Sequence, residues 1–145
     1  NDKATDFTAI LTNLKAKNCN FFADYGGVGI TQEGKVAAGE WIDIIRDRDW
    51  FEGRLRTLVY GVLVNNLKVP FTDNGIGLLE AQVRKATREA ILSGFLAEGT
   101  DTYIVPKAAE VASIDRAARR LATIKISARV AGAIHVVKID ATITA

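Results

Sequence analysis

Three carboxylates are the first candidates for chemistry in this chain. Asp43, Asp47 and Asp49 lie close enough in sequence to serve in acid/base or metal chemistry. Arg46 and Arg48 are interleaved with them, however, and acidic residues also suit the start of a helix. We therefore interpret the cluster as a solvated ion-pair surface near a helix start.

Two loop-like motifs raise the possibility of ligand binding. Glycines punctuate residues 26–34, and Lys35 follows them as in a phosphate-binding loop. The next residue is Val36, where such a loop has Ser or Thr, and the glycine spacing also differs, so we predict a hairpin turn instead. Residues 73–75, Asp-Asn-Gly, lack the series of oxygen ligands found in a calcium loop and fit a helix entrance.

The single histidine and the single cysteine have no partners suited to catalysis. His135 has neither a second metal ligand nor a nearby nucleophile, so we interpret it as a packing or interface residue. Cys19 cannot form a disulfide within the chain, and we expect an unreactive, semi-buried thiol. We therefore expect no catalytic residue, no metal site and no cofactor.

A group of arginines near the C-terminus is the strongest binding candidate. We predict a helix over residues 113–121, whose spacing would place Arg116 beside Arg119 and Arg120 on one exposed face. Such a face suits a carboxylate-rich surface, because guanidinium groups bind carboxylates with two parallel hydrogen bonds. A merely solvated helix is the alternative. Nucleic acid is disfavoured, since no recognition motif or interleaved aromatic residue accompanies the arginines.

The charge distribution also favours an acidic partner for the C-terminal quarter. The chain as a whole carries a net charge of +2. Residues 1–106 hold 12 basic and 14 acidic residues, whereas residues 107–145 hold 7 basic and 3 acidic residues. The positive charge is thus concentrated after residue 106, where the arginines lie.

The last residues of the chain alternate apolar and polar side chains, as does a strand with one buried and one wet face. Residues 124–130 alternate in the same way, and Ala131 and Gly132 supply a turn, so we predict a long amphipathic β-hairpin. Its last strand has no Pro or Gly to blunt an exposed edge, and we expect another chain to cover it. That strand comprises Val137, Lys138, Ile139, Asp140, Ala141, Thr142, Ile143 and Thr144.

Apolar spacing predicts the helices that must position these features. An N-terminal helix is expected after the possible caps Thr5 and Asp6, and a second helix over residues 47–66. A third would begin at a cap provided by Thr72 or Asp73 and end at Gly94. The expected core positions of the three helices, in order, are Phe7, Ile10, Leu11 and Leu14; Phe51, Leu55, Leu58, Val59, Val62 and Leu63; and Ile76, Leu79, Val83, Ala86 and Ala90.

Short strands complete the prediction, at residues 19–24, at residues 41–45 entering the second helix, and at residues 103–105 before Pro106. The fold class is α+β, with a small mixed or antiparallel sheet flanked by helices and a hairpin at the end. With 145 residues, 48% of them apolar, we expect a single domain over residues 1–145. No apolar run approaches the roughly 20 residues of a membrane helix, and we expect no membrane insertion. Because the chain contains no Met, we expect it to be an excised or partly ordered piece of a longer protein.

Four segments resemble the C-terminal part of tail sheath proteins of contractile-tailed bacteriophages, and more closely a sheath-related phage protein family. They are residues 39–50, 65–77, 115–121 and 132–139. The resemblance implies a structural subunit, not an enzyme, that polymerises by strand exchange around the tail tube and contracts to drive the tube through the host envelope. It also implies that the basic helix with Arg116, Arg119 and Arg120 contacts the tube, and that residues 137–144 form the inter-subunit strand.

The partners implied by this resemblance are other sheath subunits, the tail tube protein, the baseplate and the tail terminator. The implied location is the virion tail, with the host cytoplasm as the place of assembly. The first alternative is a non-contractile tail or baseplate adaptor, which would share the fold without the conformational switch. A nucleotide-binding or enzymatic domain is the remaining alternative.

Overall fold

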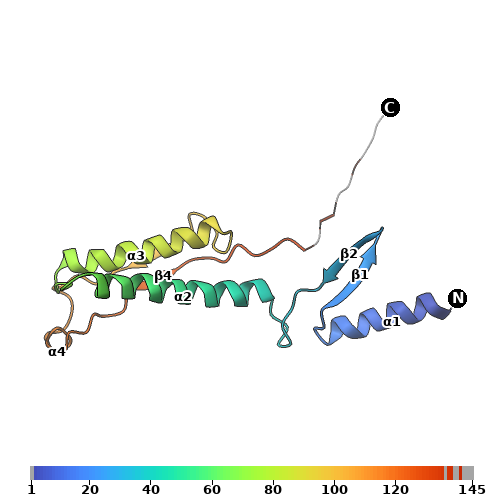
Figure 1. Ribbon diagram of the computed structural model, residues 1–145, viewed down its shortest axis with the longest axis horizontal. Coiled ribbons are helices and arrows are strands. Elements are labelled where there is room, and N and C mark those ends of the chain that lie inside the picture. The colour runs from blue at the N-terminus through green and yellow to red at the C-terminus, as the bar shows by residue number, and fades with distance from the viewer. Residues whose placement is uncertain (1, 136, 139–140, 142–145) are drawn as a thin grey trace. The chain divides into compact units, whose positions relative to one another are not determined.

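The computed structural model describes residues 2–135, 137, 138 and 141. The chain divides into two compact units, Asn1–Gly53 and Arg54–Ala145, and the long helix α2 (Ile42–Asn65) crosses the boundary between them. The described elements are helices and two antiparallel sheets of two strands each (Figure 1). The predicted α+β class is therefore confirmed.

The first unit contains helix α1 (Asp2–Ala16) and a hairpin of β1 (Phe21–Tyr25) and β2 (Val28–Gln32). Gly26 and Gly27 form the turn, with φ angles of +64° and +86°. Two successive positive φ angles are characteristic of a type I′ turn, whose twist matches that of the strands it joins. The glycine-rich stretch thus makes a hairpin, as predicted.

Two expectations for α1 are wrong. The helix begins at Asp2, so Thr5 and Asp6 lie inside it and cannot cap its first turn. Ile10 is exposed, whereas Leu11 and Leu14 are half-buried, because the covered face of the helix is narrower than its apolar stripe.

The segment before α2 is held by an asparagine side chain and not by a strand. The Asn20 amide donates to the Lys35 carbonyl oxygen at 2.9 Å, and its oxygen accepts from the Lys35 backbone N–H at 2.9 Å. Trp41 forms only an isolated bridge with Lys35, and α2 begins at Ile42. The strand predicted over residues 41–45 is therefore wrong, because residues 42–45 form the first turn of α2.

The second unit is built on the C-terminal part of α2 and on α3 (Asp73–Leu92). The Arg54 guanidinium donates two hydrogen bonds to the Glu89 carboxylate, at 2.6 and 2.8 Å. This bidentate pair joins the first α2 residue of the unit to the last turn of α3, so the two helices run antiparallel (Figure 1).

Most of the core of the second unit comes from α3. Ile76, Val83, Ala86 and Ala90 are buried as predicted, while Leu79 is half-buried. Leu63 is exposed, contrary to prediction, because one step of about 100° along α2 turns it away from the buried Val62. The buried side chains of this unit include Val62, Ile76, Val83, Ala86, Thr87, Ala90, Phe95, Leu96 and Val111.

Both ends of α3 are closed as the sequence predicts. Thr72 is the N-cap, and its hydroxyl oxygen accepts from the Gly75 N–H at 3.3 Å. Asp73 starts the helix and accepts from the Ala108 N–H at 2.8 Å, which ties the later loop to this end of α3. Gly94, with a φ of +80°, ends the helix.

The second sheet pairs β3 (Thr102–Ile104) with β4 (Lys125–Ser127), and one further bridge joins Leu96 to Val130. The first strand of the predicted terminal hairpin is thus present in part, and its partner is β3. Residues 137, 138 and 141 adopt no strand. Residues 139, 140 and 142–144 lie outside the described residues, so the hairpin stays a prediction.

Candidate assembly surfaces

The three predicted arginines lie at the end of α4 (Ser113–Ala117), which is shorter than expected. Arg116 belongs to its last turn, whereas Arg119 and Arg120 follow it, so the helical spacing proposed for the three does not hold. The helix stops because Arg119 adopts a left-handed φ of +54°. The backbone N–H groups of Arg119 and Arg120 then donate to the carbonyl oxygens of Arg116 and Asp115, at 3.0 and 2.7 Å.

All three arginine side chains are exposed. In the part of the chain that the structure describes, none of them forms an ion pair. Helix α4 has no buried residue, and its N-cap, Ala112, has no side-chain oxygen to bond the first turn. We refer to Arg116, Arg119 and Arg120 as the arginine turn. Its cationic groups are presented to solvent on a segment that packs little.

The β3–β4 sheet has open edges. Tyr103 pairs with Ile126 at its centre, and each strand has only the other as a ladder partner among the described residues. A two-stranded sheet leaves one row of N–H and C=O groups unpaired on each side. These edges can accept a further strand.

The C-terminal segment exposes large apolar side chains. Ile134 and Val137 are 85% and 71% exposed, although both side chains are large and apolar. His135 is also exposed and is not in a strand, so its predicted interface role stays a prediction. Of the predicted inter-subunit strand, the structure describes Val137, Lys138 and Ala141.

An apolar stripe on α2 was missed by the sequence analysis. Tyr60, Leu63 and Val64 on the helix, and Leu67 just beyond its end, are each more than half exposed. We call these four residues the α2 stripe. The signal that could have revealed it is the absence of any charged residue from Thr57 to Leu67.

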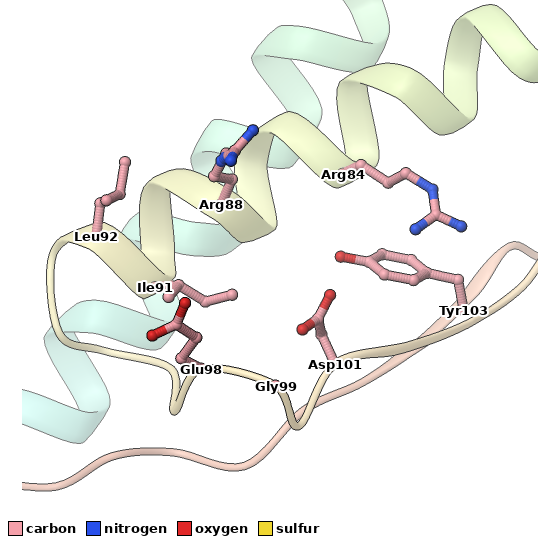
Figure 2. A pocket seen from close by; sticks show the side chains of 8 residues that line it. All are labelled: Arg84, Arg88, Ile91, Leu92, Glu98, Gly99, Asp101 and Tyr103. Atoms are coloured by element: carbon pink, nitrogen blue, oxygen red, sulfur yellow. The ribbon is translucent and has the colours of Figure 1, made fainter.

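A cavity of about 350 Å³ lies between α3 and the segment that leads into β3 (Figure 2). The Arg84 guanidinium lies 4.1 Å from the centre of the Tyr103 ring and pairs with Glu80 at 2.7 Å. Burial raises the pKa of the Tyr103 phenol, and a hydrogen bond with Thr87 partly offsets this. The lining residues are Arg84, Arg88, Ile91, Leu92, Glu98, Gly99, Asp101 and Tyr103.

Charged side chains of both signs line this cavity. Two arginines come from α3, and two carboxylates come from the segment that leads into β3 (Figure 2). Its lining contains no Ser, Cys or His. The cavity is better described as a polar surface hollow.

The other residues that were candidates for chemistry lie in a helix, in an ion pair or beside a backbone carbonyl group. Asp43 lies in the first turn of α2, and Arg48 and Asp49 form an exposed ion pair at 3.7 Å, as the ion-pair interpretation predicts. Cys19 is half-buried, and its thiol lies 3.8 Å from the Lys17 carbonyl oxygen.

Among residues 2–135, 137, 138 and 141, no group of three or more His, Cys, Asp or Glu residues could hold a metal ion. No helix within the described residues is long and apolar enough to span a membrane.

Comparison with known proteins identifies a family to which the chain is similar. A family model described as "E217 tail sheath protein gp31-like, C-terminal domain" matches residues 42–143, which is more than two thirds of the chain. The match includes all of α2, the arginine turn and most of the alternating C-terminal run. No curated protein matches the chain.

Proposed function

The chain belongs to the E217 gp31-like family of tail sheath C-terminal domains, and from this premise we propose that it forms part of a contractile phage tail sheath. Membership of this family supports a structural role in the virion tail and assembly with other sheath subunits. The observation that carries the proposal is the match over residues 42–143, because it contains both exposed features that need a partner, the arginine turn and the C-terminal run.

Strand exchange is the proposed mode of contact between subunits. Residues 137–144 would leave their own subunit and pair with an open edge of a neighbour's β3–β4 sheet. Main-chain hydrogen bonds would then join the subunits, and the alternating side chains would set the register. Two observations support this assignment: the open sheet edges, and the absence of strand pairing at Val137, Lys138 and Ala141.

The arginine turn is the proposed contact with the tail tube. Its three exposed guanidinium groups lie in the segment with a net charge of +4 and would bind carboxylates on the tube. Each exposed contact is worth only about 1 kcal/mol or less. A sheath repeats the contact in every subunit, so weak contacts add up to firm attachment that remains sensitive to salt.

Contraction completes the proposed function. Strand-exchange contacts can persist while subunits rotate as rigid bodies, because the hydrogen bonds move with the exchanged strand. The neighbouring subunits would thus stay linked while the sheath shortens and drives the tube through the host envelope. We place the protein in the virion tail, with assembly in the host cytoplasm and with the baseplate and tail terminator as further partners.

Strand exchange is tested by removing the proposed strand from the full-length sheath protein. Deletion of residues 137–145, or Ile139→Pro, should abolish polymerisation while the helical circular dichroism is kept, because Pro removes a ladder donor. Ile139→Val is the matched control and should still polymerise. Native-like sheath tubes from the deletion variant would refute strand exchange.

Tube attachment is tested by reversing the charges of the arginine turn. Arg116→Glu, Arg119→Glu and Arg120→Glu together should release the sheath from the tube in a pull-down assay. Reversal of Lys68, Lys85 and Lys107 to Glu changes the net charge equally at exposed sites outside the β3–β4 sheet, and this control should retain attachment. Unchanged binding and unchanged salt dependence in the first variant would show that the arginine turn has another role.

Electron micrographs separate a contractile sheath from a static adaptor. A contractile sheath should appear in extended and shortened forms on tubes of equal length. A single invariant length under conditions that trigger the phage would instead favour a non-contractile tail or baseplate adaptor.

A further inference from the structure

The α2 stripe is an exposed apolar surface without an assigned function. Tyr60, Leu63, Val64 and Leu67 are spaced by three and four residues, so the helical members fall along one side of α2. No charged side chain interrupts the run from Thr57 to Leu67. A contiguous apolar patch on a helix is typical of a docking surface, whereas single exposed apolar residues are ordinary.

This stripe is separate from the face of α2 that packs in its own unit. The covered face consists of Leu55, Leu58 and Val59, which are half-buried, and of Val62, which is buried. At about 100° per residue, the centre of the stripe lies roughly 140° around the helix axis from the centre of that face. The stripe therefore adds nothing to the core of the subunit.

The same unit has a second exposed apolar surface in its C-terminal segment. Ile134 and Val137 are exposed there, and residues 137, 139, 141, 143 and 145 continue the apolar side of the alternating run. Only Lys138 and Asp140 carry charge between residue 130 and the end of the sequence. Each copy of the chain thus combines an exposed apolar stripe on α2 with an apolar, alternating C-terminal run, of which Val137 is exposed.

We infer that the α2 stripe is the docking site for the apolar side of the C-terminal run of a neighbouring copy of this chain. The inference rests on the proposed strand exchange and adds where the side chains of the exchanged strand are buried. The contact is heterologous, since a stripe on one copy binds a run on the next. Such contacts propagate into an open helical assembly when the rotation between copies does not close a ring.

The dimensions of the two surfaces agree. From Tyr60 to Leu67 the stripe extends about 10 Å along the helix at 1.5 Å per residue. Residues 137–141 extend about 13 Å as a strand at 3.3 Å per residue, and they present three apolar side chains to one face. One copy of the run is therefore long enough to cover the stripe.

Charge substitution tests whether the stripe is needed for assembly of the full-length protein. Leu63→Glu with Val64→Glu should reduce sheath formation at least tenfold in sedimentation assays. Leu78→Glu with Leu92→Glu is the matched control, because both leucines are exposed on α3 outside the stripe, and it should assemble normally. Normal assembly of the stripe variant would overturn the inference.

Photocrosslinking identifies the occupant without depending on the stability of the glutamate variant. A benzoylphenylalanine placed at position 63 would be irradiated in sheaths assembled from equal amounts of ¹⁵N-labelled and unlabelled chains. Trypsin cleaves after Arg129 and Lys138, so the peptides that begin at residues 130 and 139 report the C-terminal run. Mixed-isotope crosslinks to either peptide are expected. Crosslinks to α2 of a neighbour, to the tube protein or within one chain would overturn the inference.

The two proposals fail in different ways. If the unaltered full-length protein forms no sheath, the proposed function is wrong. If sheaths form but position 63 never reaches either C-terminal peptide, the sheath function stands and only the docking site is wrong.

Discussion

Helices α3 and α4 end with the same hydrogen-bond pattern but with different residues at its critical position. At the end of α3, the N–H of Phe95 donates to the carbonyl oxygen of Ala90, and the N–H of Gly94 donates to that of Ile91, both at 3.0 Å. The chain turns at Gly94, whose φ is +80°. Glycine is the usual residue there, because it has no Cβ to clash in the left-handed region.

At the end of α4 the same two hydrogen bonds form around an arginine. Arg119 occupies the left-handed position with a φ of +54°, and Arg120 makes the longer-range bond back to Asp115. A side chain with a Cβ in this conformation costs about 1–2 kcal/mol. Arg119 is therefore strained at a position where glycine would not be.

The packing of the two helices shows a corresponding difference, since α3 is well supported and α4 is not. Helix α3 has a threonine cap, a bidentate tie to α2 and a buried face that includes the fully covered Thr87. Helix α4 has no side-chain cap and no buried residue. The comparison indicates that α3 is built for stability, whereas α4 keeps a costly arginine in an exposed turn, as expected of a surface that binds a partner.

The largest expected effect on stability is at the first turn of α3, where Gly75 packs closely against the backbone of Pro70. Gly75→Ala should lower the free energy of unfolding by about 3 kcal/mol, because the added methyl group would overlap the Pro70 carbonyl oxygen. Gly77→Ala is the matched control in the same helix, since nothing lies within 4 Å of its added methyl group. The control should gain about 0.5–1 kcal/mol. Urea unfolding followed by circular dichroism measures both, and equal effects would contradict tight packing at α3.

The next effect is at the end of α3. Gly94→Ala should destabilise the chain by about 1 kcal/mol, because alanine at φ +80° is strained although the surrounding space is open. Gly53→Ala is a control at a helical glycine that also has open space. It should not destabilise the chain. An unchanged urea midpoint for Gly94→Ala would show that α3 does not depend on its glycine end.

The converse substitution at α4 should have a smaller and opposite effect on stability. Arg119→Gly relieves the left-handed strain but adds chain entropy to the unfolded state, so we expect a net gain of about 0.5 kcal/mol. The same variant should bind tail tube more weakly if the arginine turn is the tube contact. A loss of both stability and binding would indicate that Arg119 makes a structural contact, and the comparison with α3 would fail.

The smallest effect is the pH dependence of the tie between α3 and α2. The hydrogen bonds from Arg54 hold the pKa of the Glu89 carboxyl below its usual 4.5. A depressed pKa stabilises the folded chain above about pH 4.5, and this contribution is lost as the pH falls through the lowered value. Glu89→Gln and Arg54→Met should each flatten the change in urea midpoint between about pH 5 and pH 3. A slope equal to that of the unaltered chain would show that the pair does not contribute.

The helices that bury one face were largely predictable. The cap at Thr72, the end at Gly94 and the core positions Ile76, Val83, Ala86 and Ala90 follow from local periodicity and turn chemistry. The family resemblance was also visible in the sequence, and the match over residues 42–143 confirms it. These features depend on near neighbours in the chain, where a single sequence is most informative.

Other features were not predicted, because they depend on contacts between distant residues or on a turn that no glycine marks. The helix predicted over residues 113–121 stops at Ala117, because Arg119 turns left-handed without a glycine to announce it. The pairing of β4 with β3, which lies well before it in the chain, was not predicted. The exposure of Leu63 was missed because a helical stripe does not show how much of it a neighbouring helix covers.

The sequence by itself determined the main helices, the β1–β2 hairpin, the concentration of positive charge after residue 106 and the alternating C-terminal run. Each is encoded by spacing, turn residues or charge along a short stretch of chain. Only the tertiary structure decided that α3 supplies most of the core, that the arginine turn is exposed and strained, and that one side of α2 is left uncovered. The physical reason is that burial depends on which surfaces meet, and those surfaces come from segments far apart in the sequence.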